Sequence, residues 1–139
     1  GETDVSIHMI DKNIHVIADK NHLLRVLNNL LKNAIQAIPE DRPGIISMEL
    51  RKEDNNAVII VTDNGTGISE EKRDKVFVPN FTTKSSGTGL GLAMSKNIIE
   101  SFYGSIYFET EVNEGTSFFV KLPIEEIKEL TLETDLVQA

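Results

Sequence analysis

The sequence predicts a single α/β domain, and three observations lead to that prediction. Short apolar runs bounded by turn residues occur at several places and are typical of strands. Two longer segments with helical periodicity lie between them, and the first follows a capping aspartate. The chain has 139 residues, of which 40% are hydrophobic, so it is long enough to bury one core. The alternating order of these segments indicates an α/β fold.

The first predicted elements are two short strands and a long helix. The runs VSIHMI (5–10) and IHVI (14–17) are predicted to be strands joined by a turn at 11–13. Asp19 is a candidate N-cap for a helix that ends before Pro39, because its side chain can accept a hydrogen bond from a free backbone N–H of the first turn.

Turn residues divide the rest of the chain into two predicted hairpins and two helices. Asp54-Asn55-Asn56 and Asn113-Glu114-Gly115 are typical hairpin loops, and Gly104 is a typical helix stop. The remaining predicted elements are a hairpin of 45–52 with 57–63, a short helix over 69–77, a helix over 89–102, and a last hairpin of 105–112 with 116–123.

The long helix has two contrasting faces when its positions are projected at about 100° per residue. Asn29, Asn33 and Gln36 gather on one side. They fit a solvated polar face, although such a face normally uses Lys, Glu and Arg. Alternatively, carboxamides stacked one turn apart could bind a hard cation or a polar ligand. The opposite face is a normal core stripe of Leu23, Leu27, Leu30, Leu31, Ala34 and Ile38.

Two glycine-containing segments are also candidates for a binding site. In TDNGTGI (62–68), D-N-G is common turn chemistry, but the aspartate ends an apolar strand where its carboxylate can accept hydrogen bonds in a half-buried pocket. Glycines at 87, 89 and 91 form either a flexible loop or an anion site in which backbone N–H groups and a helix N-terminus hold a phosphate. Their spacing matches neither the dinucleotide fingerprint nor the P-loop.

Taken in order, these motifs resemble the ATP-binding domain shared by sensor histidine kinases, type II topoisomerases, mismatch-repair ATPases and heat-shock chaperones. NNLLKNAIQA resembles its N box, DNGTGI its adenine loop, VFVPNFTTK the histidine-kinase F box, GTGLGLA its phosphate glycines, and EGTSF its last motif. The NAIQA and FTTK variants are most similar to nitrogen-regulation-type kinases. The resemblance covers roughly residues 5 to 123. It implies a two-layer α/β sandwich of the Bergerat type, with a mixed sheet covered on one face by three helices.

The resemblance further implies a site for ATP and Mg²⁺. Asp63 would accept the adenine amino group, reinforced through water by Thr116, and Asn33 would ligate Mg²⁺. Loop 78–88 would be a lid that carries Lys84 towards the γ-phosphate. The expected nucleotide-binding residues are Asn29, Asn33, Gln36, Asp63, Gly65, Gly67, Ile68, Thr83, Lys84, Gly87, Thr88, Gly89, Leu90, Gly91, Leu92 and Thr116.

A kinase is expected rather than an ATPase, because Asn29 lies where hydrolytic relatives carry a glutamate that activates water. The resemblance implies transfer of the γ-phosphate to a histidine on the dimerisation and phosphoacceptor domain of a parent kinase, and from there to a response regulator receiver domain. His8, His15 and His22 lie outside any H-E-h-R-x-P-L pattern (h apolar), so the acceptor is not expected in this chain. The alternatives are an anti-sigma-type serine kinase and a non-catalytic nucleotide-sensing module.

Composition limits the other function classes. A formal net charge of −8 argues against nucleic-acid binding. The chain contains no cysteine, no apolar run near the length of a membrane span and no signal-like start. Together with these features, the resemblance implies that residues 1–123 form a cytoplasmic ATP-binding domain without direct membrane contact, and we expect residues 124–139 to form an acidic tail. The parent kinase could still be anchored in the inner membrane.

Overall fold

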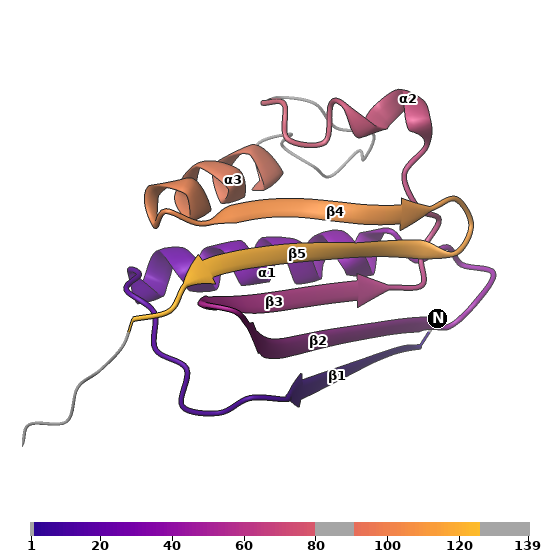
Figure 1. The fold of residues 1–139 in the computed structure, drawn as a ribbon. Coiled ribbons are helices and arrows are strands. Elements are labelled where there is room, and N and C mark those ends of the chain that lie inside the picture. Colours follow the sequence, from indigo (N-terminus) through magenta and orange to yellow (C-terminus); the bar gives the residue numbers. More distant parts are fainter. Residues whose placement is uncertain (1, 80–90, 126–139) are drawn as a thin grey trace, which may run out of the picture.

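The computed structural model describes residues 2–79 and 91–125. These residues form five strands and three helices, in which α1 lies between β1 and β2, and α2 and α3 lie between the β2–β3 and β4–β5 hairpins (Figure 1). The elements are β1 (Thr3–Met9), α1 (Lys20–Gln36), β2 (Gly44–Glu53), β3 (Asn56–Asp63), α2 (Glu70–Arg73), α3 (Gly91–Ser101), β4 (Ser105–Glu111) and β5 (Gly115–Pro123).

The five strands form one mixed sheet in the order β1-β2-β3-β5-β4. β1 is parallel to β2, while the other neighbours are antiparallel, so α1 is the crossover between the two parallel strands. The long helices α1 and α3 pack on the same side of the sheet, and the opposite side has no helix over it in the described residues (Figure 1). The predicted two-layer α/β sandwich with a mixed sheet is thereby confirmed.

The core lies between the sheet and the two long helices. Val26, Leu30 and Ala34 of α1 are buried against the sheet. Leu30 and Ala34 belong to the predicted apolar stripe, whereas Val26, which has no exposed surface, was missing from it. The other buried members of the cluster come mostly from the inner face of the sheet, namely Ile46, Ile59, Val61, Ile99, Ile106, Phe118, Val120 and Leu122.

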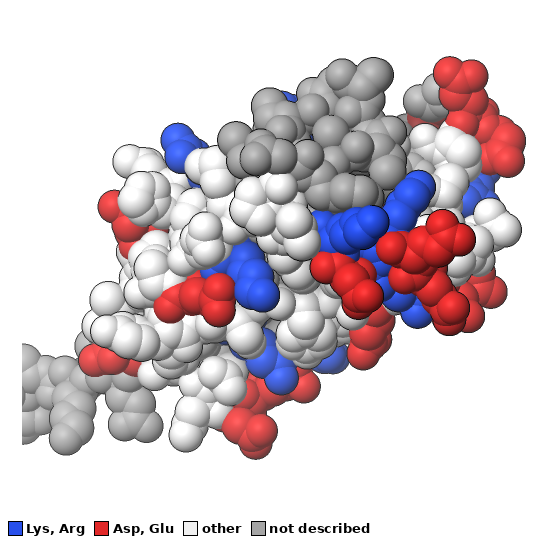
Figure 2. Space-filling model, turned by 90° about the horizontal axis from the view of Figure 1, so that it is seen from above, with Lys and Arg blue, Asp and Glu red and all other residues white. Residues whose placement is uncertain are grey.

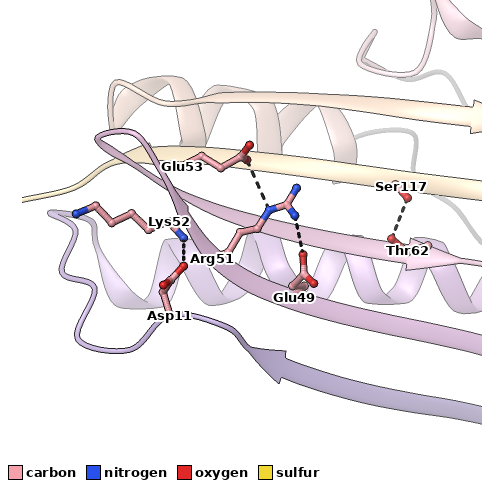
Figure 3. Close-up of polar contacts among 7 residues, drawn as sticks. All are labelled: Asp11, Glu49, Arg51, Lys52, Glu53, Thr62 and Ser117. Carbon is pink, nitrogen blue, oxygen red and sulfur yellow. Dashed lines mark hydrogen bonds and ion pairs between the residues drawn. The ribbon is translucent and has the colours of Figure 1, made fainter.

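The predicted strand at 14–17 is not a strand in the structure. β1 pairs with β2, in register from Thr3 opposite Gly44 to Met9 opposite Leu50, instead of folding back on residues 14–17. The ladder ends where the Asp11 carboxylate accepts a hydrogen bond of 2.7 Å from the backbone N–H of Lys52 (Figure 3).

Residues 11–19 then form an irregular connection to α1, with Asn13 at φ of 60°. The carbonyl oxygen of His15 accepts a hydrogen bond of 2.7 Å from the N–H of Glu125, beyond the end of β5. Ile14, Val16 and Ala18 are half-buried, while the residues between them are exposed. The alternation of apolar residues therefore arises because one side of this connection is half-buried, and not because the segment is a strand of the sheet.

Capping chemistry was predicted better than element length. Asp19 is the N-cap of α1, since its Oδ1 accepts a hydrogen bond of 3.0 Å from the N–H of His22. This bond holds the pKa of Asp19 below its ordinary value of 3.8. The helix predicted over 69–77 is shorter than expected, because α2 contains only four residues after its N-cap Ser69.

Gly104 follows α3 as predicted, but for a different reason from the expected helix stop. The residue with positive φ is Tyr103, at 63°, and the N–H of Gly104 bonds to the carbonyl of Ile99 at 3.0 Å. This is the pattern of a Schellman cap with tyrosine in the left-handed position. A side chain at Gly104 would meet the carbonyl oxygen of Lys121 on β5, so the glycine permits close contact between the end of α3 and the sheet.

The open side of the sheet carries pairs of polar side chains. The Arg51 guanidinium lies between the carboxylates of Glu49 and Glu53, at 3.5 Å and 3.7 Å, and the hydroxyls of Thr62 and Ser117 pair across β3 and β5 (Figure 3). On the face seen from above, Lys and Arg side chains lie beside Asp and Glu side chains (Figure 2). Within residues 2–79 and 91–125, no helix combines the length and apolar character needed to cross a membrane.

Candidate functional site

Three segments that are distant in sequence meet where β3 ends. They are the C-terminal end of α1, the loop 63–68 after β3, and the hairpin turn between β4 and β5. The N–H of Thr66 donates to the carbonyl of Ala37 at 3.0 Å, and the N–H of Asn113 donates to the carbonyl of Thr66 at 2.8 Å. Backbone bonds thus hold the loop from the helix side and from the hairpin side.

Asp63 is the buried polar group at this junction, with 4% of its surface exposed. Its Oδ1 accepts hydrogen bonds from the backbone N–H of Gly65 at 2.8 Å and of Thr116 at 3.2 Å. These donors fix the orientation of the carboxylate. The interpretation of D-N-G as a surface turn is therefore wrong at Asp63, and the carboxylate is buried more deeply than the half-buried position predicted.

Thr116 contacts the carboxylate directly through its backbone. Its side-chain hydroxyl pairs with the hydroxyl of Thr110 at 2.9 Å. Thr110 Oγ1 also accepts a hydrogen bond from the N–H of Ile68 at 2.9 Å. Thr110 therefore connects the two expected site residues, Thr116 and Ile68, although no sequence motif pointed to it.

The glycines of the loop are required by contacts within the protein. A Cβ at Gly65 would lie 2.6 Å from the carbonyl oxygen of Ala37, at the end of α1. Gly67 has φ of 76°, and a Cβ there would meet the carbonyl oxygen of Glu111. Gly115, which was predicted as a turn residue and as part of the EGTSF motif, has φ of 136° and faces the carbonyl of Asp63 in the same way. Glycine at these positions lets the three segments approach each other.

Asn64 is another residue whose role the sequence did not reveal. Its side-chain oxygen accepts a hydrogen bond of 2.7 Å from the N–H of Ile45, and its side-chain nitrogen donates to the carbonyl of Pro43 at 3.1 Å. The loop is thereby attached to the start of β2 as well. The D-N-G sequence indicated a turn, but it did not indicate that the Asn64 side chain bonds to Pro43 and Ile45.

The amide stripe of α1 begins at the interface with α3. Asn29 is half-buried, and its Nδ2 donates to the carbonyl of Gly91 at 3.3 Å and to Ser95 Oγ at 3.4 Å. Asn33 is half-buried and Gln36 is exposed. The structure therefore brings Asn29 together with Gly91, which were predicted as separate parts of one site. Leu92, the other described member of the glycine segment, packs against the core.

The rest of the predicted phosphate segment lies outside the described residues. Most of loop 78–88 also lies outside them. So do the predicted site residues Thr83, Lys84, Gly87, Thr88, Gly89 and Leu90, and the predicted acidic tail from residue 126 onwards.

A hollow of about 270 Å³ lies beside Asp63, on the hairpin side of the junction. Glu109, Glu111 and Glu114 contribute to its lining, whereas Asn33 and Gly91 do not. Its acidic lining would repel a triphosphate. Across the described ranges, no group of three or more His, Cys, Asp or Glu side chains could hold a metal ion.

Comparison with known proteins gives consistent matches. Residues 18–126 match the family described as histidine kinase-, DNA gyrase B-, and HSP90-like ATPases. The chain is 38% identical over 117 residues to sporulation kinase D of Bacillus subtilis (strain 168), covering 84% of this chain and 23% of that protein. It is 43% identical over 107 residues to the sensor histidine kinase ZraS of Escherichia coli (strain K12). This match covers 77% of this chain and 23% of that protein.

A solved structure agrees with these matches. The catalytic domain of histidine kinase ThkA superposes with a TM-score of 0.76 at 35% identity, and the match covers 87% of this chain and 78% of that one. The chain therefore spans about a quarter of the length of the curated relatives, 23% in both cases, but most of a separately solved domain.

Proposed function

The chain belongs to the family of histidine kinase-, DNA gyrase B- and HSP90-like ATPases, and we propose that it binds Mg-ATP and transfers the γ-phosphate to a histidine on a separate phosphoacceptor domain. One observation carries this proposal. The buried Asp63 carboxylate is held by two backbone donors at the junction of β3, α1 and the β4–β5 hairpin. The match to a solved histidine-kinase catalytic domain supports the same function.

Asp63 is proposed to recognise the base. Oδ1 accepts hydrogen bonds from the N–H groups of Gly65 and Thr116, so the carboxylate is already oriented before a ligand binds. Its other oxygen would accept a hydrogen bond from the amino group of adenine. Guanine carries an acceptor oxygen at the corresponding ring position, so the same carboxylate would disfavour it. Gly67 and Ile68 would shape the pocket around the ring.

The polar stripe of α1 is proposed to bind the phosphates and Mg²⁺. Asn33 offers a neutral carboxamide oxygen, which is a suitable ligand for this hard cation, and Mg²⁺ usually takes one or two protein ligands. Bound Mg²⁺ would neutralise charge on the triphosphate. Asn29 holds the first turn of α3 against α1, and Gln36 would lie along the phosphates. Residues Gly87 to Leu92 would wrap the triphosphate, with Thr83 and Lys84 closing over it.

Transfer to another domain is favoured over hydrolysis by the chemistry of Asn29. Its Nδ2 is a donor to Gly91 and Ser95, and an amide cannot take a proton from water. Phosphoryl transfer then depends on positioning and charge neutralisation. His22 lies in the first turn of α1, roughly 16 Å along the helix axis from Asn33, too far for in-line attack.

A phosphotransfer assay tests the proposal. The chain alone, with labelled ATP and Mg²⁺, should bind nucleotide and incorporate almost no acid-labile phosphate. Adding the histidine-bearing domain of the parent kinase should produce label on that domain only. Label on a serine would support an anti-sigma-type kinase, and binding without transfer would support a nucleotide-sensing module. Stoichiometric phosphohistidine on this chain, lost in His22→Ala, would contradict the assignment.

Three finer points remain proposals. We propose, from the NAIQA and FTTK variants, a relationship to nitrogen-regulation-type kinases, whereas the relatives reported above are sporulation kinase D and ZraS. The expected partners are the dimerisation and phosphoacceptor domain and, through it, a receiver domain. We infer a cytoplasmic location because ATP is available there, with the parent free or anchored in the inner membrane.

A further inference from the structure

Arg42 lies in the turn between α1 and β2 and bridges both segments that surround Asp63. Its Nη2 donates to the carbonyl oxygen of Gly65 at 2.8 Å, and its Nη1 donates to the carbonyl oxygen of Asn113 at 3.1 Å. The side chain is half-buried. One planar guanidinium thus joins the loop after β3 to the β4–β5 hairpin.

The two carbonyls that Arg42 holds belong to residues that are also fixed on their N–H side. The N–H of Gly65 donates to Asp63 Oδ1 at 2.8 Å. The N–H of Asn113 donates to the carbonyl of Thr66 at 2.8 Å. Arg42 therefore closes a ring of hydrogen bonds that runs from the hairpin through the loop and reaches the carboxylate through Gly65.

We propose that Arg42 is a positioning residue for base recognition, because it restrains the loop that orients Asp63. This inference rests on the proposed function, in which Asp63 binds adenine. Gly65 and Gly67 give the loop little intrinsic stiffness, so its geometry depends on contacts made from outside. A restraint that already exists before binding lowers the conformational cost of binding the base.

An arginine is suited to this position by its geometry. The guanidinium presents its N–H donors in a rigid planar fork, so two terminal nitrogens can each reach a different carbonyl. The ammonium group of a lysine is a compact point charge on a flexible stem and does not fix two acceptors in one plane. Arg42→Lys therefore keeps the charge and removes the bidentate restraint, which separates the two contributions.

The test compares Arg42→Met and Arg42→Lys with a matched control, Arg51→Met. Arg51 lies on the open side of the sheet between two glutamates and away from the junction (Figure 3). Three quantities are measured on the full chain: the Kd values of Mg-ATP and Mg-GTP by calorimetric titration, the thermal midpoint, and hydrogen exchange at the amides of residues 64–67.

We expect Arg42→Met to weaken Mg-ATP binding about tenfold, the effect of losing roughly one charge-assisted hydrogen bond from the restraint. Binding of Mg-GTP depends less on Asp63, so its affinity should fall by less than that of Mg-ATP. The ratio of the Mg-GTP Kd to the Mg-ATP Kd should therefore decrease. Exchange at 64–67 should become faster in both Arg42 variants. Arg51→Met should leave both Kd values within about twofold of the wild-type values, since surface substitutions away from a site have small effects.

The outcomes separate this inference from the proposed function. If the wild-type chain binds Mg-ATP and both Arg42 variants keep its affinity and base selectivity, the role of Arg42 is overturned and the function stands. A lower thermal midpoint with unchanged selectivity would likewise reduce Arg42 to a structural residue. If Arg42→Met does not fold, Arg42→Lys decides by the same criteria. No binding of ATP by the wild-type chain would overturn both proposals.

Discussion

Asp63→Asn replaces one carboxylate oxygen by an amide nitrogen and leaves the shape of the side chain unchanged. The structure decides which oxygen is replaced. Oδ1 accepts hydrogen bonds from the N–H groups of Gly65 and Thr116, at 2.8 Å and 3.2 Å, and neither group can act as an acceptor. With these two donors at Oδ1, we expect the amide oxygen to remain there and the NH₂ group to take the position of Oδ2.

The expected effects on folding and on binding differ in size. Both backbone hydrogen bonds survive in Asp63→Asn and lose only their charge assistance, so the free energy of unfolding should fall by about 1 kcal/mol. In the ATP complex, the new NH₂ group would face the adenine amino group, so two donors would oppose each other. Loss of a hydrogen bond to a charged group costs about 1.5–3 kcal/mol, which corresponds to a Kd about 10- to 160-fold higher.

Calorimetric titration with Mg-ATP measures this loss, and thermal unfolding measures the change in stability. Asp54→Asn is a matched control, because Asp54 is exposed in the turn before β3, at the opposite end of that strand from Asp63. The control should bind Mg-ATP within about twofold of the wild-type chain, since surface substitutions away from a site have small effects. A variant Asp63→Asn with unchanged affinity and a lower thermal midpoint would refute base recognition and leave the carboxylate a structural role.

Three other changes test further parts of the fold and site. Asn33→Ala should weaken binding of Mg-ATP more than binding of ATP without Mg²⁺, because it removes an oxygen ligand, and equal losses in the two titrations would contradict the metal role. The hydrogen bond to His22 lowers the pKa of Asp19 below 3.8, so its stabilisation of α1 is present above that value and is lost as the pH falls through the lowered pKa. Asp19→Asn keeps an acceptor without titrating, so its unfolding midpoint should fall less steeply in acid than that of the wild type. Gly115→Ala, at φ of 136° and facing the carbonyl of Asp63, should lower the free energy of unfolding by about 1–3 kcal/mol in chemical denaturation, and an unchanged value would mean that the hairpin adjusts without strain.

Features that depend on a few neighbouring residues could be predicted from the sequence. The Asp19 cap and the hairpin turn before β3 follow from the chemistry of residues within four positions of each other, and both occur in the structure. The α/β class followed from the order of short apolar runs, typical of strands, and longer segments with helical periodicity. The family followed from motifs in a fixed order, and the match over residues 18–126 confirms it.

Predictions that needed a partner elsewhere in the chain were less successful. The run 14–17 has the alternation of a strand, but alternation reports that one side is buried and does not say which strand lies alongside. β1 instead pairs in parallel with β2, and α1 forms the crossover between them. Residues 14–17 are then left to connect the sheet to the helix.

The amino-acid sequence by itself determined most of the local elements, the Asp19 cap and the types of group available to a nucleotide. Only the tertiary structure decided which of these groups meet. Asn29 reaches Ser95 across 66 positions of the chain, and Arg42 reaches Asn113 across 71. The strand order β1-β2-β3-β5-β4 brings these segments together, and hydrophobic periodicity carries no information on that order. The glycines around Asp63 show the same difference: their positions are visible in the sequence, but the carbonyl groups that exclude a side chain there belong to other elements of the fold.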